Sequence, residues 1–203
     1  MSTLDWCCCR ASHYSVRNFW MESISQENIR SSNHSSPLCS RAMAALLIGR
    51  SERSLQRWMQ QGELVAQGFD RSGRIQLDLD KVLSLAGAVS PCAAEMIETI
   101  VLADSGDPVA LNDLGMMLLF DQRLKPRPSS AAALFQAAAA KHFPDAMHWL
   151  FYCFLNGIGV AKDNATALRW LSQAASFGHQ IAKAQLSIYE SYDANISVAV
   201  HSA

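Results

Sequence analysis

The sequence predicts a mostly α-helical protein, in which a solenoid of αα-hairpins follows a small module of two helices and a β-hairpin. Two observations lead to this fold class. Small and large apolar residues recur every 36 residues in the C-terminal half, and two capped helical stretches precede a glycine-containing hairpin in the middle of the chain. We therefore expect a leader without a fold of its own at 1–40, the helix and hairpin module at 41–90, repeats at 91–190 and a flexible tail at 191–203.

Composition narrows the classes of protein to which the chain can belong. It has 203 residues, half of them hydrophobic, which argues against wholesale disorder. It lacks an apolar run of the roughly 18 to 20 residues that a membrane-spanning helix needs. The formal charge of -1 gives no general attraction to nucleic acid or membranes, so any basic surface must be local. We therefore expect no membrane partner.

The first 40 residues show no sustained hydrophobic period and contain seven serines between Ser23 and Ser40. Cysteines 7 to 9 are adjacent and the others are scattered, a spacing that matches neither a zinc site nor a secreted disulfide scaffold. The first 20 residues also lack a secretory signal pattern. These features predict a cytoplasmic protein, with Met21 and Met43 as alternative starting residues.

The middle of the chain reads as two helices, a hairpin and a third helix. Ser40 can cap a helix at 41–48 that Gly49 ends, and Ser51 can cap a helix at 52–61. Residues 64–78 alternate as a β-hairpin does, around a polar tip that contains glycine. Asp80 is expected to open the helix that follows.

The strings AALLIGRSERSLQRWMQQGEL (44–64) and SGRIQLDLDKV (72–82) resemble the winged helix-turn-helix of the MerR and excisionase superfamily. The resemblance covers about 45 residues and implies a second helix in the DNA major groove and a wing on the DNA backbone. It implies DNA contacts by Arg50, Ser51, Arg53, Ser54, Gln56, Arg57, Arg71 and Arg74.

An alternative interpretation of the same module is a protein-docking or purely structural role. The basic residues of the implied footprint are diluted by Glu52, Glu63 and Asp70. A single domain with about four or five phosphate contacts would bind DNA in roughly the micromolar range and with strong salt dependence. Both interpretations stay open at this point.

The C-terminal half carries a strict 36-residue period. Ala110, Ala146 and Ala182 share one column of this repeat, and an equally spaced column contains Gly106, His142 and Gly178. Two amphipathic runs per period indicate stacked helical hairpins, in which small residues lie where helices approach closely. The predicted helices lie near 91–104, 108–120, 129–141, 144–156, 164–177 and 180–190.

The unit at 145–178 closely resembles a Sel-one-like repeat, a relative of the tetratricopeptide repeat, with Asn156–Val160 as its glycine turn. The preceding unit departs from the pattern in its interhelix loop, Phe120–Pro128. Helical solenoids of this kind bind an extended peptide or a helix along their first helices. The expected groove residues are Asn112, Asp113, Met116, His148, Tyr152, Lys183 and Gln185.

Motifs for catalysis or metal binding are missing from the sequence. It contains no HExxH, Walker A, GxSxG or paired CxxC motif. We therefore expect no catalytic residue, metal ion, cofactor or small-molecule substrate. The leading hypothesis is a non-catalytic adaptor that binds a protein partner through the repeat groove, and the alternative is a DNA-binding regulator whose repeats serve as a regulatory docking surface.

Overall fold

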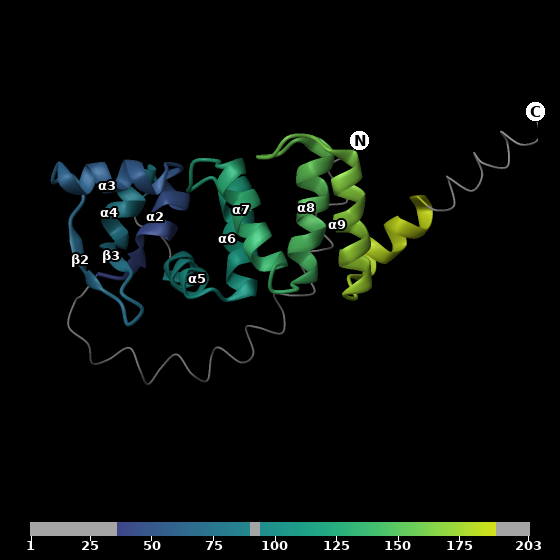
Figure 1. Ribbon diagram of the computed structural model, residues 1–203, viewed down its shortest axis with the longest axis horizontal. Helices are drawn as coiled ribbons and strands as arrows, with labels where there is room; N and C mark the ends of the chain where they lie inside the picture. Colours follow the sequence, from purple (N-terminus) through teal and green to yellow (C-terminus); the bar gives the residue numbers. More distant parts are fainter. Residues whose placement is uncertain (1–35, 90–93, 190–203) are drawn as a thin grey trace, which may run out of the picture. The chain divides into compact units, whose positions relative to one another are not determined.

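A computed structural model describes residues 36–89 and 94–189 of the chain (Figure 1). Residues 1–35 of the leader expected at 1–40, the cap expected at Ser90 and the tail expected at 191–203 lie outside these residues. Within them, strands occur only before residue 79 and helices make up the rest of the ordered structure. The prediction of a mostly α-helical chain is therefore confirmed.

The N-terminal part contains β1 (Leu38–Ser40), α2 (Arg41–Ile48), α3 (Glu52–Gln60), β2 (Ala66–Phe69), β3 (Ile75–Asp78) and α4 (Leu79–Ala86). The Oγ of Ser40 accepts the N–H of Met43, and the Oγ of Ser51 accepts the N–H of Ser54, as expected for N-caps. Gly49 ends α2 with a φ of 69°, in the left-handed region that glycine adopts without steric cost.

Two details of this part differ from expectation. The side chain of Asp78 caps α4 by accepting the N–H of Lys81, so the helix begins two residues earlier than it would with Asp80 as its cap. Strand β1 lies inside the range 1–40 that we expected to lack a fold. It pairs antiparallel with β3, Cys39 opposite Leu77, in a sheet of order β1-β3-β2.

The second part consists of α5 (Ala94–Ser105), α6 (Pro108–Phe120), α7 (Pro128–Ala139), α8 (Pro144–Asn156), α9 (Asn164–Ser176) and helical residues 180–189. Each of the helices α5 to α8 packs on the next one along the chain in a helical-repeat solenoid (Figure 1). The observed bounds agree with the 36-residue period to within a few residues.

Small residues occupy the contacts between helices, as the period predicted. Ala110, Ala146 and Ala182 are all fully buried. Gly115 lies so close to the ring of Phe135 that a Cβ there would be 2.6 Å from a ring carbon. The absence of a larger side chain at this column therefore lets α6 and α7 approach closely.

The glycine column contains one histidine that adopts the glycine conformation. His142 has a φ of 62°, and it is the one non-glycine residue with positive φ among those the structure describes. Gly106 and Gly178, which are 36 residues away on either side, have φ values of 91° and 97°. The turn between successive repeats therefore imposes the left-handed conformation, and the ring of His142 stacks on Phe177 there, at a centroid distance of 4.9 Å.

Candidate functional site

Helix α3 presents a basic and amide-bearing face. A shallow surface recess is lined by Arg53, Gln56, Arg57 and Gln60, while Leu55 faces the core and is fully buried. Within the described part of the chain, the guanidinium groups of Arg50, Arg53 and Arg57 form no hydrogen bond or ion pair. These cationic groups are therefore available to an anionic partner.

Among the other implied DNA contacts, Ser51, Ser54 and Arg74 already bind groups of the protein itself. Ser51 and Ser54 bond to each other at 3.0 Å between hydroxyl oxygens, in addition to the helix cap. Arg71 is exposed at the hairpin tip. Arg74 does not extend freely from the hairpin, because its Nε donates to Oδ2 of Asp70 at 2.6 Å. Two carboxylates, those of Asp70 and Asp104, therefore already compete for the charge of Arg74, and its contact with a DNA backbone stays a prediction.

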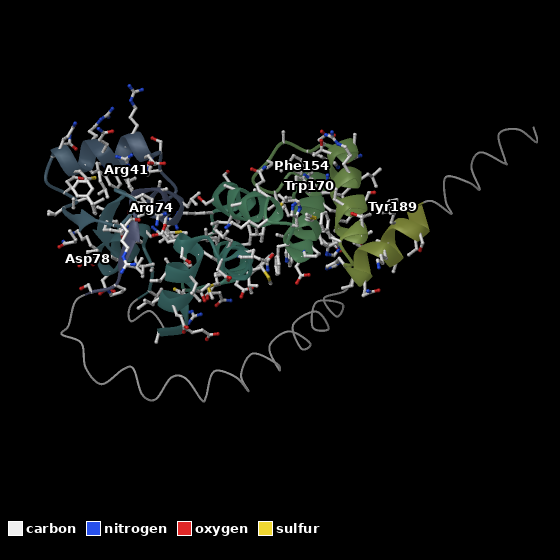
Figure 2. All side chains as sticks on the ribbon, turned by 60° about the horizontal axis from the view of Figure 1, so that its bottom comes forward. Arg41, Arg74, Asp78, Phe154, Trp170 and Tyr189 are labelled. Carbon is white, nitrogen blue, oxygen red and sulfur yellow. The ribbon has the colours of Figure 1, made fainter. Side chains whose placement is uncertain are left out.

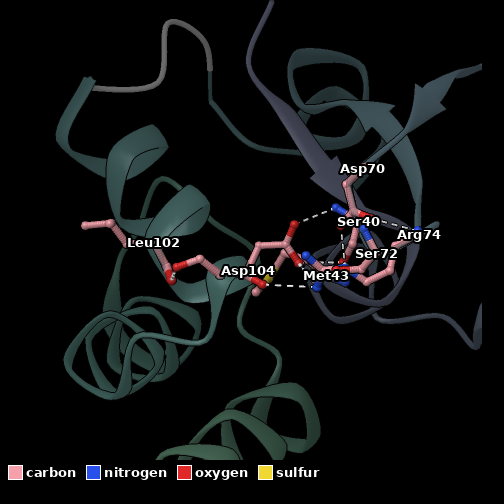
Figure 3. Close-up of polar contacts among 8 residues, drawn as sticks. Ser40, Met43, Asp70, Ser72, Arg74, Leu102 and Asp104 are labelled. Atoms are coloured by element: carbon pink, nitrogen blue, oxygen red, sulfur yellow. Dashed lines mark hydrogen bonds and ion pairs between the residues drawn. The ribbon is translucent and has the colours of Figure 1, made fainter.

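Asp104, at the end of α5, joins the hairpin module to the first repeat helix (Figure 3). The N–H of Ser40 donates to Oδ2 of Asp104 at 2.7 Å, and the Ser40 hydroxyl donates to Oδ1 at 2.5 Å. Arg74 lies 4.0 Å from the same carboxylate and donates to the Asp104 carbonyl at 3.4 Å. One carboxylate therefore binds both the strand β1 and the hairpin arginine.

Asp70 completes this cluster of polar contacts. It accepts the backbone N–H groups of Ser72 and Arg74, each at 2.8 Å, which fixes the turn of the hairpin. The Arg74 backbone bond, with the other hydrogen bonds and the arginine charge, lowers the pKa of the Asp70 carboxyl. The carboxylate therefore stays ionised and holds Arg74 toward α5.

The unusual loop between α6 and α7 contacts the hairpin module. Arg127 donates from its guanidinium to the Ala86 carbonyl at 2.9 Å, and the Val89 N–H donates to the Arg123 carbonyl at 2.9 Å. Leu124, in the middle of the loop, is buried. The departure of this loop from the repeat pattern therefore has a physical reason, because the loop packs against the end of α4.

The expected groove residues divide into two groups. Asp113, Met116, Tyr152 and Gln185 are half-buried and Lys183 is exposed, whereas Asn112 and His148 are only 4% and 8% exposed. The two buried side chains are a correction to the expectation of a free groove surface. The Oδ1 of Asn112 has no hydrogen-bond partner among the described residues.

His148 is buried because the terminal helix at 180–189 covers it. The Nε2 of Gln185 donates to the Tyr152 hydroxyl at 3.0 Å. The Oε1 of the same amide accepts a hydrogen bond from Nε2–H of His148 at 2.8 Å. The ring of His179 lies 4.2 Å from that of His148, centroid to centroid. Burial is the main cause that lowers the pKa of His148 to about 4, so the ring is neutral at pH 7.

Aromatic residues pack along α8 and extend to its neighbours. Trp149 stacks on Phe135 of α7, with ring centroids 5.9 Å apart and planes 13° apart, and it also contacts Phe120. Figure 2 shows Phe154 on α8, Trp170 on α9 and Tyr189 on the terminal helix. Trp149 therefore belongs mainly to the packing between repeats.

Two cysteines lie within the described residues, and neither thiol is exposed. Cys39 and Cys153 are free and buried, and burial raises the pKa of Cys39 to about 12 and that of Cys153 to about 11. Both thiols therefore stay protonated and unreactive at neutral pH. Across residues 36–89 and 94–189, no three His, Cys, Asp or Glu side chains come together as metal ligands would. In the same ranges, none of the helices has the length and apolar character of a membrane span.

Sequence reasoning missed Asp104, Arg127 and His179, which make contacts across large separations in the chain. Asp104 is 64 residues from Ser40, and no local pattern marks the pair. His179 could have been noted, since it follows the glycine column and lies 3.7 Å from Asp145 at the start of the preceding unit.

Two solved structures are similar to part of this chain. Among solved structures, the chain is similar to a Sel1 repeat protein from Oxalobacter formigenes, at 30% identity and a TM-score of 0.44, over 46% of this chain and 38% of that chain. It is also similar to a protective antigen of uropathogenic Escherichia coli strains that displays an SLR fold, at 21% identity and a TM-score of 0.43, over 57% of this chain and 26% of that chain. The chain thus spans less than half the length of either protein.

No curated protein matches the chain. The pattern of the Sel1 repeat family matches two consecutive stretches, 108–143 and 144–179. These stretches cover α6 with α7 and α8 with α9, the two complete helical hairpins. Residues 108–179 of this chain are therefore two Sel1 repeats.

Proposed function

We propose that this protein is a non-catalytic adaptor that binds a partner protein through the first helices of its repeats. Sel1 repeats generally mediate protein–protein interactions, and solenoids of helical hairpins offer extended surfaces for them. The observation that carries the proposal is a column of partly exposed side chains on successive first helices. We name this column the first-helix stripe, and it consists of Met116, Tyr152 and Ile188.

The first-helix stripe has the chemistry of a protein-binding surface. Its members are 36 residues apart and occupy equivalent positions of α6, α8 and the terminal helix. Ile188 is 67% exposed, and Met116 and Tyr152 are half-buried. Methionine and tyrosine supply adaptable and amphipathic contacts, and both are enriched at protein interfaces. Asp113 and Lys183 supply polar groups on the same helices.

Capture of binding proteins from an extract of the source cells tests this proposal with two matched variants of the full chain. Ile188→Asp places a carboxylate on the stripe, whereas Gln136→Asp places one on the exposed side of α7. We expect a defined set of proteins to bind wild type and Gln136→Asp equally and to be lost with Ile188→Asp. Equal capture by all three proteins would contradict a role for the stripe.

The second candidate function is DNA binding, and the exposed face of α3 favours it. Arg50, Arg53 and Arg57 surround the amide side chains of Gln56 and Gln60, a combination suited to phosphates and base edges. Among the residues that the structure describes, Arg74 is the one implied basic residue that pairs with carboxylates. The resemblance of this part to a winged helix-turn-helix supports the same candidate.

A gel-shift titration at several salt concentrations separates the two candidates. If α3 binds DNA, Arg53→Ala with Arg57→Ala abolishes the shift, and the affinity of wild type falls steeply as salt rises. Arg169→Ala with Lys183→Ala removes the same charge from the repeats and leaves the shift unchanged. The absence of a shift at low salt eliminates DNA binding without affecting the adaptor proposal.

A further inference from the structure

A hollow of about 590 Å³ lies where the turn between α2 and α3 faces the beginning of α7. Its volume is within the range of ordinary ligand pockets. The hollow is separate from the first-helix stripe, which lies on other helices. The residues that line it are Ala42, Ala45, Leu46, Gly49, Arg50, Ser51, Glu52, Arg127, Pro128, Ser129 and Ser130.

One wall of the hollow is apolar and belongs to α2. Ala42, Ala45 and Leu46 lie on one side of this helix, and Gly49 continues the wall into the turn. A Cβ on Gly49 would lie 2.8 Å from Nε of Arg127, so the glycine keeps the turn and the arginine close together. This wall suits an aliphatic side chain.

The opposite wall is the N-terminus of α7. This helix begins with Pro128 and has no side-chain cap, unlike α3 or α9. The first amides of a helix carry partial positive charge and have no partner within the helix. This feature alone does not make a site, but it gives one wall the polarity that an anion prefers.

Ser130 is the observation that points to a ligand. Its side chain lines the hollow, the residue is only 8% exposed, and its hydroxyl meets no hydrogen-bond partner in the described parts of the chain. The hydroxyl oxygen itself is not sealed from solvent, so it can form a hydrogen bond to a group that enters the hollow. A bound acceptor would satisfy this hydroxyl.

The charges around the hollow favour an anionic acceptor. Arg50 and Arg127 line it, and neither forms an ion pair with a described residue. Arg127 instead donates to the carbonyls of Ala86 and Lys125, at 2.9 and 3.2 Å. The one carboxylate of the lining, Glu52, accepts Nε of Arg41 at 3.0 Å. Two guanidinium groups thus face one neutralised carboxylate.

We propose that this hollow binds a carboxylate carried by a short peptide segment of a partner protein, with an aliphatic neighbour of the carboxylate against α2. The carboxylate would accept the Ser130 hydroxyl and the α7 N-terminus and would pair with Arg50 and Arg127. The apolar wall favours a peptide over a nucleic-acid phosphate, because the sugar-phosphate backbone has no aliphatic side chain to place there. This proposal does not depend on a role for the first-helix stripe.

The experiment is an NMR titration of the full-length, ¹⁵N-labelled protein with two end-blocked tetrapeptides, Leu-Ala-Glu-Leu and Leu-Ala-Gln-Leu, at constant ionic strength. We expect saturable shifts of the Ser129 and Ser130 amides with the glutamate peptide and about tenfold weaker binding of the glutamine peptide. Arg50→Gln and Ser130→Ala should each weaken binding of the glutamate peptide several-fold. Arg71→Gln, which removes a charge outside the hollow, should leave it unchanged.

Three results would overturn the proposal. The first is equal binding of the two peptides, and the second is an equal loss of affinity in Arg71→Gln and Arg50→Gln. The third comes from a parallel titration with inorganic phosphate, in which phosphate saturates the Ser130 amide and the glutamate peptide does not. That result would assign the hollow to phosphate groups instead of a peptide carboxylate.

Discussion

The solvent exposure of a single side chain in this protein depends on which neighbouring helix covers it. His148 belongs to the side of α8 on which groove residues were expected, yet it is buried, because Gln185 from the terminal helix binds its ring. Its column partner Asn112 is buried as well, with one amide oxygen unpaired. The 36-residue period correctly placed Asn112 and His148 in one column. Whether these side chains are exposed depends on the helix that packs over them, which the period does not show.

The burial of His148 makes stability depend on pH in a defined window. Its pKa is about 4 in the folded protein and about 6.5 in the unfolded chain, so only the unfolded chain takes up a proton between these values. The contribution of His148 to the free energy of unfolding should therefore be constant above about pH 6.5 and fall by up to about 3 kcal/mol as the pH drops to about 4.

Urea denaturation of wild type and His148→Gln at pH 7, 5.5 and 4.5 measures this effect. Other carboxylates and histidines titrate in both proteins, so the difference between the two isolates His148. The difference should shrink steadily as the pH falls. A difference that is independent of pH would mean that the ring titrates normally in the folded state.

Gly159 tests how closely the second repeat loop approaches α7. Its φ is 72°, and a Cβ there would overlap the Pro128 carbonyl. Gly178 has a φ of 97° with open space around it, so it provides a matched control. Gly178→Ala should cost about 1 kcal/mol from backbone strain, and Gly159→Ala about 2 to 4 kcal/mol because overlap is added to strain. Equal unfolding free energies for the two variants would show that the loop moves away from α7 without cost.

At the scale of elements, most helices could be predicted and one strand could not. Pro108, Pro144 and the caps at Ser40, Ser51 and Asp163 mark helix starts that local chemistry alone determines. The strand Leu38–Ser40 is too short to show alternation, and it forms because β3 has an open edge beside it. Of the candidate sites, the arginines of α3 were predictable from helix periodicity, but the contacts of Arg74 with Asp70 and Asp104 depend on tertiary structure.

Asp104 should contribute to the stability of the strand it binds. Removal of its carboxylate in Asp104→Ala leaves the buried N–H and hydroxyl of Ser40 without their acceptor, at a cost of about 2 to 3 kcal/mol. Asp80→Ala, at an exposed position of α4, should change stability by less than about 0.5 kcal/mol. Hydrogen exchange of the Ser40 amide provides the direct readout, since it should accelerate in Asp104→Ala alone. An unchanged exchange rate would mean that β1 is held by its pairing with β3 and not by α5.

At the scale of the whole molecule, the described residues bring a basic helix face, a repeat surface and the hollow beside α7 into one protein. The loop between α6 and α7 couples them, since Leu124 is buried and Arg127 binds the end of α4. The Sel1 repeat pattern accounts for the helical hairpins, whereas the contacts of this loop with α4 depend on the hairpin module. One molecule of the protein can therefore hold a partner on its first helices and a second ligand on α3 or in the hollow.

Site-specific photo-crosslinking tests the central claim, that partners bind along the first helices, most directly. A photoreactive amino acid is placed at Met116 or Ile188 on the stripe, or at Gln136 or Gln173 on the exposed sides of α7 and α9. The adaptor account predicts crosslinks to the same partner from both stripe positions and none from the two control positions. Crosslinks of equal yield from Gln136 and Gln173, or a partner reached only from those positions, would contradict it.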